Sequence, residues 1–279
     1  MTLQSLLKDN PPLIMGILNL TPDSFSDGGS YIDKTQAIDF ALQMVKEGAD
    51  IIDVGGESTR PDAQRVPPEV QLQRVVEVIT MLRQRLPGKI PISIDTTRSE
   101  VARAAVIAGA SIINDVRSGR DDEEILEFAA EKNLPIILMH MQGTPKTMQI
   151  NPSYEDVVKE VKMFFRERCQ KALALGLPKA NIIIDPGIGF GKTKDHNLKL
   201  MAYLNELTTI GYPVMLGTSR KRFMGAICAG AKPKDLIGAT CATTALGVQA
   251  GVRIFRVHDI KQNRQAANVA WAIHSCRCT

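Results

Sequence analysis

An apolar run near the start of the chain reads Leu13-Ile14-Met15-Gly16-Ile17-Leu18-Asn19, and it ends in a polar residue. Seven more runs are similarly short and rich in Ile, Leu and Val, and most also end in a polar residue: 51–54, 92–95, 112–115, 136–140, 182–185, 214–217 and 254–257. Glycine, proline or polar residues bound these runs. Such features are typical of strands buried in a parallel sheet.

Helical patterns fill the intervals between these runs. The segment 38–45 has one apolar face, and Gly48 follows it as a typical helix end. Thr97 and Glu100 predict a capping box at the start of another helix. Further helices are expected at 72–82, 101–108, 154–175, 199–207, 237–248 and 262–273.

Eight strand-like runs alternating with helices predict an α/β protein, a single-domain (β/α)8 TIM barrel over residues 1–279. The structural competitor is an open doubly wound sheet, which normally has a glycine-rich turn after its first strand. Here Leu20-Thr21-Pro22-Asp23 follows that strand instead. No internal repeat or linker divides the chain, so we expect one domain.

The composition excludes several classes of protein. The 34 basic and 30 acidic residues give a formal net charge of +4, which is too small to predict nucleic-acid binding. No apolar stretch approaches the roughly 20 residues of a membrane span. The cysteines number five, and this odd count argues against a disulfide framework. We therefore expect a cytoplasmic protein with reduced thiols that binds neither nucleic acid nor a membrane.

Polar residues follow nearly every strand run. A lone Asp at a strand end is usually a turn or cap residue, but in a barrel of this kind all carboxyl ends of the strands share one face. We therefore expect the active site there. Its candidates are Asn19, Glu57-Ser58-Thr59-Arg60, Asp95, Asn114 with Asp115, His140, Asp185, Ser219 with Lys221, and Arg256 with His258.

The residue types in this set indicate a ligand with two different ends. Asp95, Asn114 and Asp185 offer oxygens to a flat heterocycle with adjacent N–H donors. Lys221, Arg60 and Arg256 are cations that suit an anionic group, and the loops after strands seven and eight are the usual phosphate site of this fold. Asn19 could place Mg²⁺ against phosphate oxygens.

Two loops have the composition of mobile segments at the mouth of the barrel. Loop one, residues 20–30, is long, polar and glycine-bearing, and we interpret it as a lid. Loop two, residues 55–67, is similar. A plain surface turn is the alternative for both.

Three motifs favour ordinary roles over special ones. Gly191-Lys192-Thr193 resembles the end of a phosphate-binding loop, but Pro186 stands where that motif needs its first glycine. His140 is expected to be a core histidine that hydrogen-bonds to backbone. Ser219 has no obvious base beside it in the sequence, so no Ser–His–Asp triad is predicted.

Two long strings resemble signatures of the dihydropteroate synthase family, IMGILNLTPDSFSDGG at 14–29 and GADIIDVGGESTRP at 48–61. Shorter blocks at 93–96, 113–115, 185–192, 219–222 and 256–259 are similar to the remaining blocks of the family. The resemblance covers nearly the whole chain, from Leu13 to about Asp259. The family joins p-aminobenzoate to 6-hydroxymethyl-7,8-dihydropterin diphosphate in a (β/α)8 barrel with Mg²⁺, usually as a homodimer.

The resemblance also implies roles for individual residues. It places the pterin on Asp95, Asn114, Asp185 and Lys221, the diphosphate on Thr59, Arg256 and His258, and Mg²⁺ on Asn19. It places p-aminobenzoate, and a sulfonamide that mimics it, among Phe190, Ser219, Lys221 and Pro61. Phe25 and Asp27 would close over the site in loop one, and we expect Asp27, Arg60 and Lys221 to act in catalysis.

Two alternatives share part of this pattern. A barrel methyltransferase that acts on methyltetrahydrofolate would share the pterin-binding Asp and Asn residues, but it has no reason to keep cations around 219–221 and 256–258. A non-catalytic pterin-binding paralogue is the alternative from another class, and the intact loop motifs argue against it. Release of diphosphate from the two substrates separates both alternatives from a synthase.

Overall fold

The structure is a computed structural model that describes residues 7, 11–21, 31–59 and 63–276, the side chains of 31–33 excepted. Its eight strands pair in parallel in the order β6-β5-β4-β3-β2-β1-β8-β7, and a bridge between Ile184 and Val214 joins the two ends. The sheet therefore forms the (β/α)8 barrel that the sequence predicts. The strands are β1 (Leu13–Asn19), β2 (Ile51–Gly55), β3 (Ile92–Asp95), β4 (Ile112–Asp115), β5 (Ile136–Met139), β6 (Ile182–Asp185), β7 (Met215–Leu216) and β8 (Ile254–Val257).

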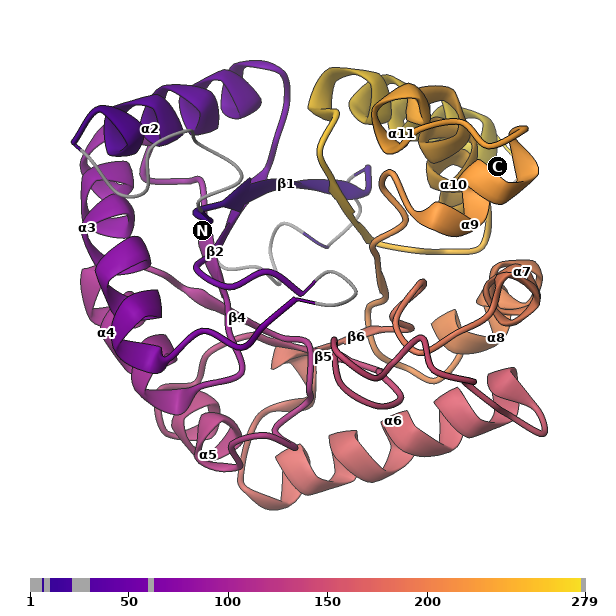
Figure 1. Cartoon of the computed structure of the whole chain (residues 1–279), viewed down its shortest axis with the longest axis horizontal. Coiled ribbons are helices and arrows are strands. Elements are labelled where there is room, and N and C mark those ends of the chain that lie inside the picture. The colour runs from indigo at the N-terminus through magenta and orange to yellow at the C-terminus, as the bar shows by residue number, and fades with distance from the viewer. Residues whose placement is uncertain (1–6, 8–10, 22–30, 60–62, 277–279) are drawn as a thin grey trace.

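Helices form a ring around the strands (Figure 1). A large apolar cluster fills the layer between this ring and the outer face of the sheet. The helices are α2 (Tyr31–Lys46), α3 (Pro68–Arg85), α4 (Ser99–Ala108), α5 (Glu124–Glu131), α6 (Val157–Ala174), α7 (Lys194–Ala202), α8 (Leu204–Thr208), α9 (Arg222–Ile227), α10 (Ile237–Gln249) and α11 (Ile260–Ser275). No helix among these residues is long and apolar enough to cross a membrane.

Two predicted details of the helices are wrong. Thr97 and Glu100 do not form a capping box, because α4 begins later, at Ser99. The Ser99 amide donates instead to the Asp122 carboxylate from the next loop, at 2.7 Å. The helix expected over 199–207 is two helices, α7 and α8, which meet at Tyr203.

The barrel interior is divided into an apolar half and a polar half. Side chains alternate along a strand, so residues two apart point to the same side. The inward residues of the amino-terminal half are apolar: Leu13, Met15, Ile51, Ile112, Ile137, Ile183, Met215 and Ile254. Two residues further along, the inward positions of β2, β4, β6 and β8 are polar, namely Asp53, Asn114, Asp185 and Arg256. The floor of the barrel is therefore dry, and its polar groups meet at the carboxyl ends of the strands.

Candidate functional site

A cavity of about 700 Å³ opens at the carboxyl ends of the strands. The ten described residues to which the family resemblance assigns a role all line it: Asn19, Thr59, Asp95, Asn114, Asp185, Phe190, Ser219, Lys221, Arg256 and His258. Of the other strand-end candidates, Ser58 lines it as well, whereas Glu57, Asp115 and His140 do not. The other four predicted residues, Phe25, Asp27, Arg60 and Pro61, lie outside the described residues. The barrel thus brings together, around one cavity, side chains that are more than 200 positions apart in the chain.

Arg256 bridges two carboxylates at the base of this cavity. Its guanidinium donates to Asp53 Oδ2 at 2.6 Å and to Asp95 Oδ2 at 2.8 Å. Burial disfavours the charge on Arg256, but the two carboxylates outweigh burial and its pKa is raised. Burial also raises the pKa of Asp95 to about 7, with Arg256 opposing the shift. At neutral pH the Asp95 carboxyl group is therefore close to its pKa, where protonated and ionised forms are both present.

Asp53 is a site residue that the sequence analysis missed. It is fully buried, and the same Oδ2 that binds Arg256 accepts a hydrogen bond from Asn114 Nδ2 at 3.1 Å. One carboxylate oxygen thus holds a residue expected at the pterin and a residue expected at the diphosphate. The available signal was an Asp inside an otherwise apolar strand run, since a buried charge requires a partner.

Three buried polar atoms near this group have no hydrogen-bond partner within the described part of the chain: Asp53 Oδ1, Ser93 Oγ and Asn114 Oδ1. An unpaired buried acceptor costs about 1–3 kcal/mol. Because Asn114 lines the cavity, its free amide oxygen is available to an N–H donor of a bound ligand. This is the acceptor expected for a heterocycle with N–H groups.

Asp185 and Lys221 place opposite charges on the far side of the cavity. Burial raises the pKa of Asp185, and the amide of Gly187, which donates to Asp185 Oδ1 at 2.7 Å, opposes that shift. Burial lowers the pKa of Lys221 to about 8, and the charge of Asp185 opposes it. Lys221 Nζ lies 3.9 Å from the centre of the Phe190 ring, in a cation–π contact. The pair offers an acceptor and a donor beside an aromatic face.

Ser219 has a histidine beside it in space, although none lies near it in the sequence. Ser219 Oγ and His258 Nδ1 are 3.0 Å apart, because β7 and β8 are neighbours in the barrel. Asp259 does not complete a triad, since its carboxylate binds the Arg220 guanidinium at 2.6 and 3.0 Å. We interpret Ser219 and His258 as ligand donors at one rim of the cavity.

His140 is a core histidine, as expected, and its ring also lies against a buried lysine. His140 Nδ1 lies 2.9 Å from the ammonium nitrogen of Lys192, which is itself only 2% exposed. Lys192 is therefore a buried structural cation rather than the lysine of a phosphate-binding loop. Sequence could not reveal the pair, because its members follow different strands.

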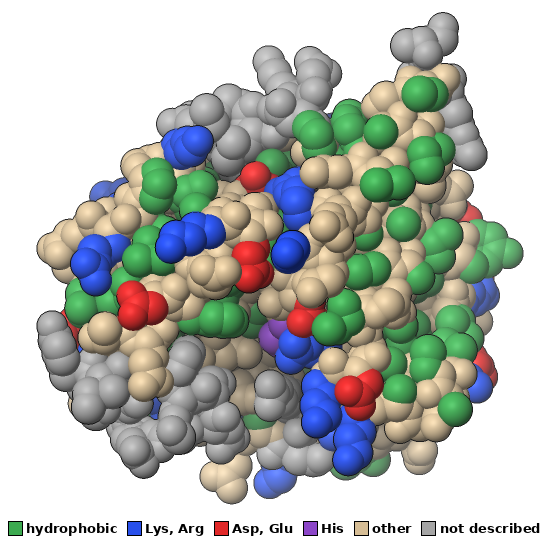
Figure 2. All heavy atoms as spheres, turned by 90° about the horizontal axis from the view of Figure 1, so that it is seen from above, with side chains coloured by type: hydrophobic (Ala, Val, Ile, Leu, Met, Phe, Trp, Pro, Cys, Tyr) green, Lys and Arg blue, Asp and Glu red, His purple; other side chains and the backbone are tan. Residues whose placement is uncertain are grey.

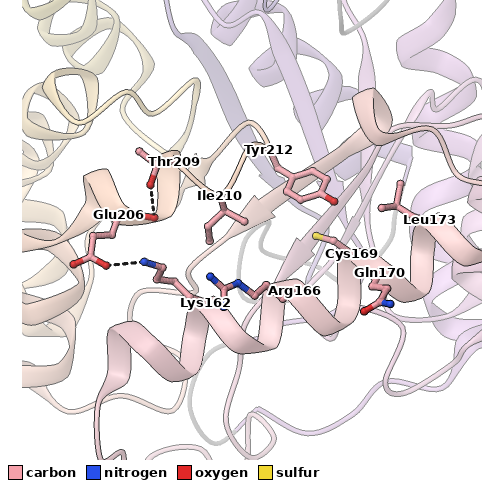
Figure 3. Close-up of a pocket in the computed structure, with 9 residues that line it drawn as sticks. All are labelled: Lys162, Arg166, Cys169, Gln170, Leu173, Glu206, Thr209, Ile210 and Tyr212. Carbon is pink, nitrogen blue, oxygen red and sulfur yellow. Dashed lines mark hydrogen bonds and ion pairs between the residues drawn. The ribbon is translucent and has the colours of Figure 1, made fainter.

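A second cavity, of about 370 Å³, lies in the outer layer between α6 and the segment that follows α8 (Figure 3). Lys162 on α6 donates to Glu206 on α8 across one end of it, at 2.7 Å. Cys169 and Tyr212 line its other end. This cavity lies in the helix layer, away from the carboxyl ends of the strands where the predicted site residues gather, so it is not the candidate active site.

The expected Mg²⁺ site would have Asn19 as its protein ligand. Within the described ranges, no group of three or more His, Cys, Asp or Glu side chains could hold a metal ion. Asn19 ends β1 and lines the cavity with one amide oxygen. Mg²⁺ commonly uses one or two protein oxygens and takes its remaining ligands from water and substrate phosphates. A single Asn therefore fits an ion that is held mainly by a diphosphate.

Comparison with known proteins gives a consistent result. The family model described as pterin binding enzyme matches residues 15–258. The dihydropteroate synthase of Synechocystis is 46% identical over 260 residues, covering 93% of this chain and 89% of the relative. That of Escherichia coli K12 is 44% identical over 266 residues, covering 95% and 93%.

Solved structures agree with these relatives. A Xanthomonas albilineans dihydropteroate synthase with 4-aminobenzoic acid is 42% identical, has a TM-score of 0.88, and is matched over 95% of this chain and 94% of that one. A complex of the synthase from the same organism with 7,8-dihydropteroate is 39% identical, with a TM-score of 0.85 and 95% coverage of both chains.

Proposed function

This chain belongs to the dihydropteroate synthase family of pterin-binding enzymes, and we propose how its cavity divides between the two substrates of that reaction. The protein is a transferase of folate biosynthesis that condenses p-aminobenzoate with 6-hydroxymethyl-7,8-dihydropterin diphosphate. The observation that carries the assignment is the ring of polar strand ends around one cavity, in which hydrogen-bond acceptors and cations face the same space.

The pterin occupies the deep part of the cavity in this proposal. Asn114 Oδ1 and the Asp185 carboxylate accept hydrogen bonds from the pterin N–H groups, and Lys221 donates to its carbonyl oxygen. The unpaired state of Asn114 Oδ1 supports this placement. Asp95 lies beside them, held by Arg256. A pterin bound there supplies partners that the buried polar groups otherwise lack.

p-Aminobenzoate lies nearer the rim, against Phe190, Ser219 and Lys221. The Phe190 ring supplies a flat apolar face, and Lys221 places a positive charge next to it. The Ser219 hydroxyl can donate to the carboxylate of the substrate. Pro61 is expected to complete this pocket from loop two.

Thr59, His258 and Arg256 bind the diphosphate. His258 is positioned by Ser219, and Arg256 by its two carboxylates. Asn19 would hold Mg²⁺, which would supply positive charge to offset the charge that develops on the leaving group. Removal of Mg²⁺ by a chelator is expected to abolish turnover.

The reaction then needs little proton transfer. The bond between the pterin methylene carbon and the diphosphate oxygen breaks, and Arg256 and His258 stabilise the leaving oxygen. The resulting pterin cation lies between Asp95 and Asp185. The arylamine nitrogen attacks the methylene carbon, a C–N bond forms, and the amine loses one proton to water or diphosphate. Asp27 and Arg60 are proposed to assist from loops one and two.

We also propose that the enzyme is a cytoplasmic homodimer. The surface in Figure 2, viewed from the side of α2 and α11, has hydrophobic side chains spread over the part where α10 and α11 lie. Leu246, Val269 and Ile273 are more than half exposed on these two helices. Sedimentation of the purified protein tests the dimer, and a monomer at micromolar concentration would contradict it.

The division of the cavity predicts separate effects on the two substrates. Phe190→Leu removes the aromatic face, so the KM for p-aminobenzoate should rise about tenfold while that for the pterin diphosphate stays near the wild-type value. Asn114→Ala should do the reverse, because it removes the pterin acceptor. Steady-state kinetics with one substrate varied at a time measures both. Equal effects of each variant on both substrates would contradict the proposed division.

A further inference from the structure

Lys192 and His140 are buried beside the cavity, yet the proposed reaction uses neither. Lys192 is 2% exposed and His140 is 7% exposed. We propose that Lys192 is a positioning residue, which fixes the 187–190 loop so that the Phe190 ring keeps its place against Lys221. This inference rests on the function proposed above, because Phe190 is assigned to the p-aminobenzoate pocket.

Four acceptors surround the Lys192 ammonium at hydrogen-bond distance. His140 Nδ1 is 2.9 Å from Nζ, the carbonyl oxygens of Gly187 and Phe190 are each 3.0 Å away, and the carbonyl oxygen of His140 lies at 3.4 Å. An ammonium group has three N–H donors, so it can satisfy the three nearest acceptors at once. Two of the four acceptors belong to the loop after β6, and the other two belong to His140, which follows β5. Lys192 therefore ties the loop that carries Phe190 to the neighbouring strand.

The loop itself has little intrinsic order, because two of its residues and the residue that follows it are glycines with left-handed backbone. Gly187 has a φ of 64°, Gly189 of 84° and Gly191 of 63°. Glycine loses more conformational freedom on folding than other residues do. Gly189 is held separately, since its amide donates to Asn197 Oδ1 at 2.7 Å. The hydrogen bonds of Lys192 hold the carbonyl groups of Gly187 and Phe190, which lie on either side of Gly189.

The fit requires a protonated Lys192 and an unprotonated His140. Burial lowers the pKa of His140 well below its usual value, and the charge on Lys192 adds to this, so the ring is neutral. The tautomer that leaves Nδ1 unprotonated can accept from the Lys192 ammonium. Burial also lowers the pKa of Lys192 to about 7. The charged groups around Lys192 are Asp185 after β6, which favours its charge, and Lys221 and Arg120, which oppose it.

A pH dependence follows from the number of donors. Below the pKa of Lys192 its three N–H groups serve the three nearest acceptors, and above it the neutral amine has two N–H groups and leaves one more of these acceptors unpaired. The position of Phe190 should therefore loosen as pH rises through about 7. We expect the KM for p-aminobenzoate to increase between about pH 6 and about pH 8.5, a range in which p-aminobenzoate itself does not titrate.

The first test is Lys192→Met, which keeps the length of the side chain and removes its donors. The KM for p-aminobenzoate should rise about tenfold, while the KM for the pterin diphosphate changes little. The increase of the first KM with pH should become smaller, and the part that remains belongs to Lys221, whose pKa is about 8. Lys199→Met is the matched control. Lys199 is a half-exposed residue on α7 that pairs with Asp156 at 3.4 Å, so its removal should leave both KM values unchanged.

A second pair of variants keeps the proposal testable if Lys192→Met fails to fold. His140→Leu removes the Nδ1 acceptor and should raise the KM for p-aminobenzoate. His140→Asn places an amide oxygen near the position of Nδ1 and should restore the wild-type KM. A merely structural role for the histidine predicts no such rescue by Asn over Leu.

Several results would overturn the proposal. A wild-type KM and a wild-type pH profile in Lys192→Met would do so, as would equal behaviour of His140→Leu and His140→Asn. Failure of the proposed function is distinguishable, because wild-type protein would then release no diphosphate. In that case the dissociation constant of p-aminobenzoate, measured by calorimetry with Mg²⁺ and inorganic diphosphate present, still decides whether Lys192→Met weakens binding.

Discussion

Asp53 connects the two halves of the cavity through a single oxygen atom. Its Oδ2 accepts from Arg256 at 2.6 Å and from Asn114 at 3.1 Å, in a place without solvent access. Removing one member of a buried charge pair typically costs about 3–5 kcal/mol, because the other charge is left without its partner. Asp53 therefore supports both the fold and the orientation of the Asn114 amide.

Asp53→Ala is predicted to lower the free energy of unfolding by about 3 kcal/mol and to raise the KM for the pterin diphosphate. Asp53→Asn retains an acceptor oxygen, so both the loss of stability and the rise in KM should be much smaller. Urea unfolding and steady-state kinetics measure the two effects. Asp39→Ala, at an exposed position on α2, is the control. If Asp53→Ala were as stable as this control, Asp53 would not hold Arg256 in the folded protein.

Asp95 makes stability depend on pH. Its pKa is raised from 3.8 to about 7, mainly by burial, so between these values the folded state binds more protons than the unfolded state. The contribution of Asp95 to stability is therefore present at low pH and is lost as pH rises toward 7. We predict that Asp95→Asn, which stays neutral, has a smaller decrease in urea midpoint between about pH 5 and about pH 8 than wild type. Identical pH slopes would show that Asp95 titrates normally.

At the scale of elements, hydrogen bonds to Glu57 connect the two ends of loop two. One oxygen of its carboxylate accepts from the Val66 amide at 2.8 Å, and Gln71 donates to the other oxygen at 3.3 Å. Gln71 also donates to the Val66 carbonyl at 3.0 Å. The two ends of the loop are therefore held together beneath Thr59, which lines the cavity.

Glu57→Ala is predicted to reduce kcat/KM by about tenfold, because the segment that carries Thr59 loses its anchor. The loss of stability should be small, about 1 kcal/mol, since the loop lies at the surface. Glu100→Ala is a control at an exposed position. Kinetics and thermal unfolding separate the two quantities, and a loss of stability without a loss of activity would contradict the anchoring role.

At the scale of elements, the strands were predictable and the helix ends less so. Each strand is a short apolar run, because both faces of the barrel wall are buried, and this pattern is visible in the sequence. The start of α4 depends on Asp122, which lies 23 positions away in the chain and caps Ser99 from another loop. A local motif such as Thr97 with Glu100 cannot report such a contact.

At the scale of the molecule, barrel closure determines what the sequence could and could not reveal. Polar residues that end strands must meet at one face, so the cavity-lining set, from Asn19 to His258, was predictable. The side-chain pairs within it were not, because Arg256 with Asp53 and Lys192 with His140 join distant segments. Asp53 was missed for a related reason: it lies inside β2, and only the neighbouring strands give it partners.

Because the closed barrel gathers the site residues around one cavity, the central claim is that this cavity holds both substrates while the diphosphate leaves. The most direct measurement mixes the purified protein with Mg²⁺, p-aminobenzoate and 6-hydroxymethyl-7,8-dihydropterin diphosphate, and quantifies diphosphate and 7,8-dihydropteroate in the same samples. We predict that the two products form in equal amounts and that neither forms at the same rate when p-aminobenzoate is left out. Binding of the pterin diphosphate without release of diphosphate would contradict the account and would indicate a non-catalytic pterin-binding protein.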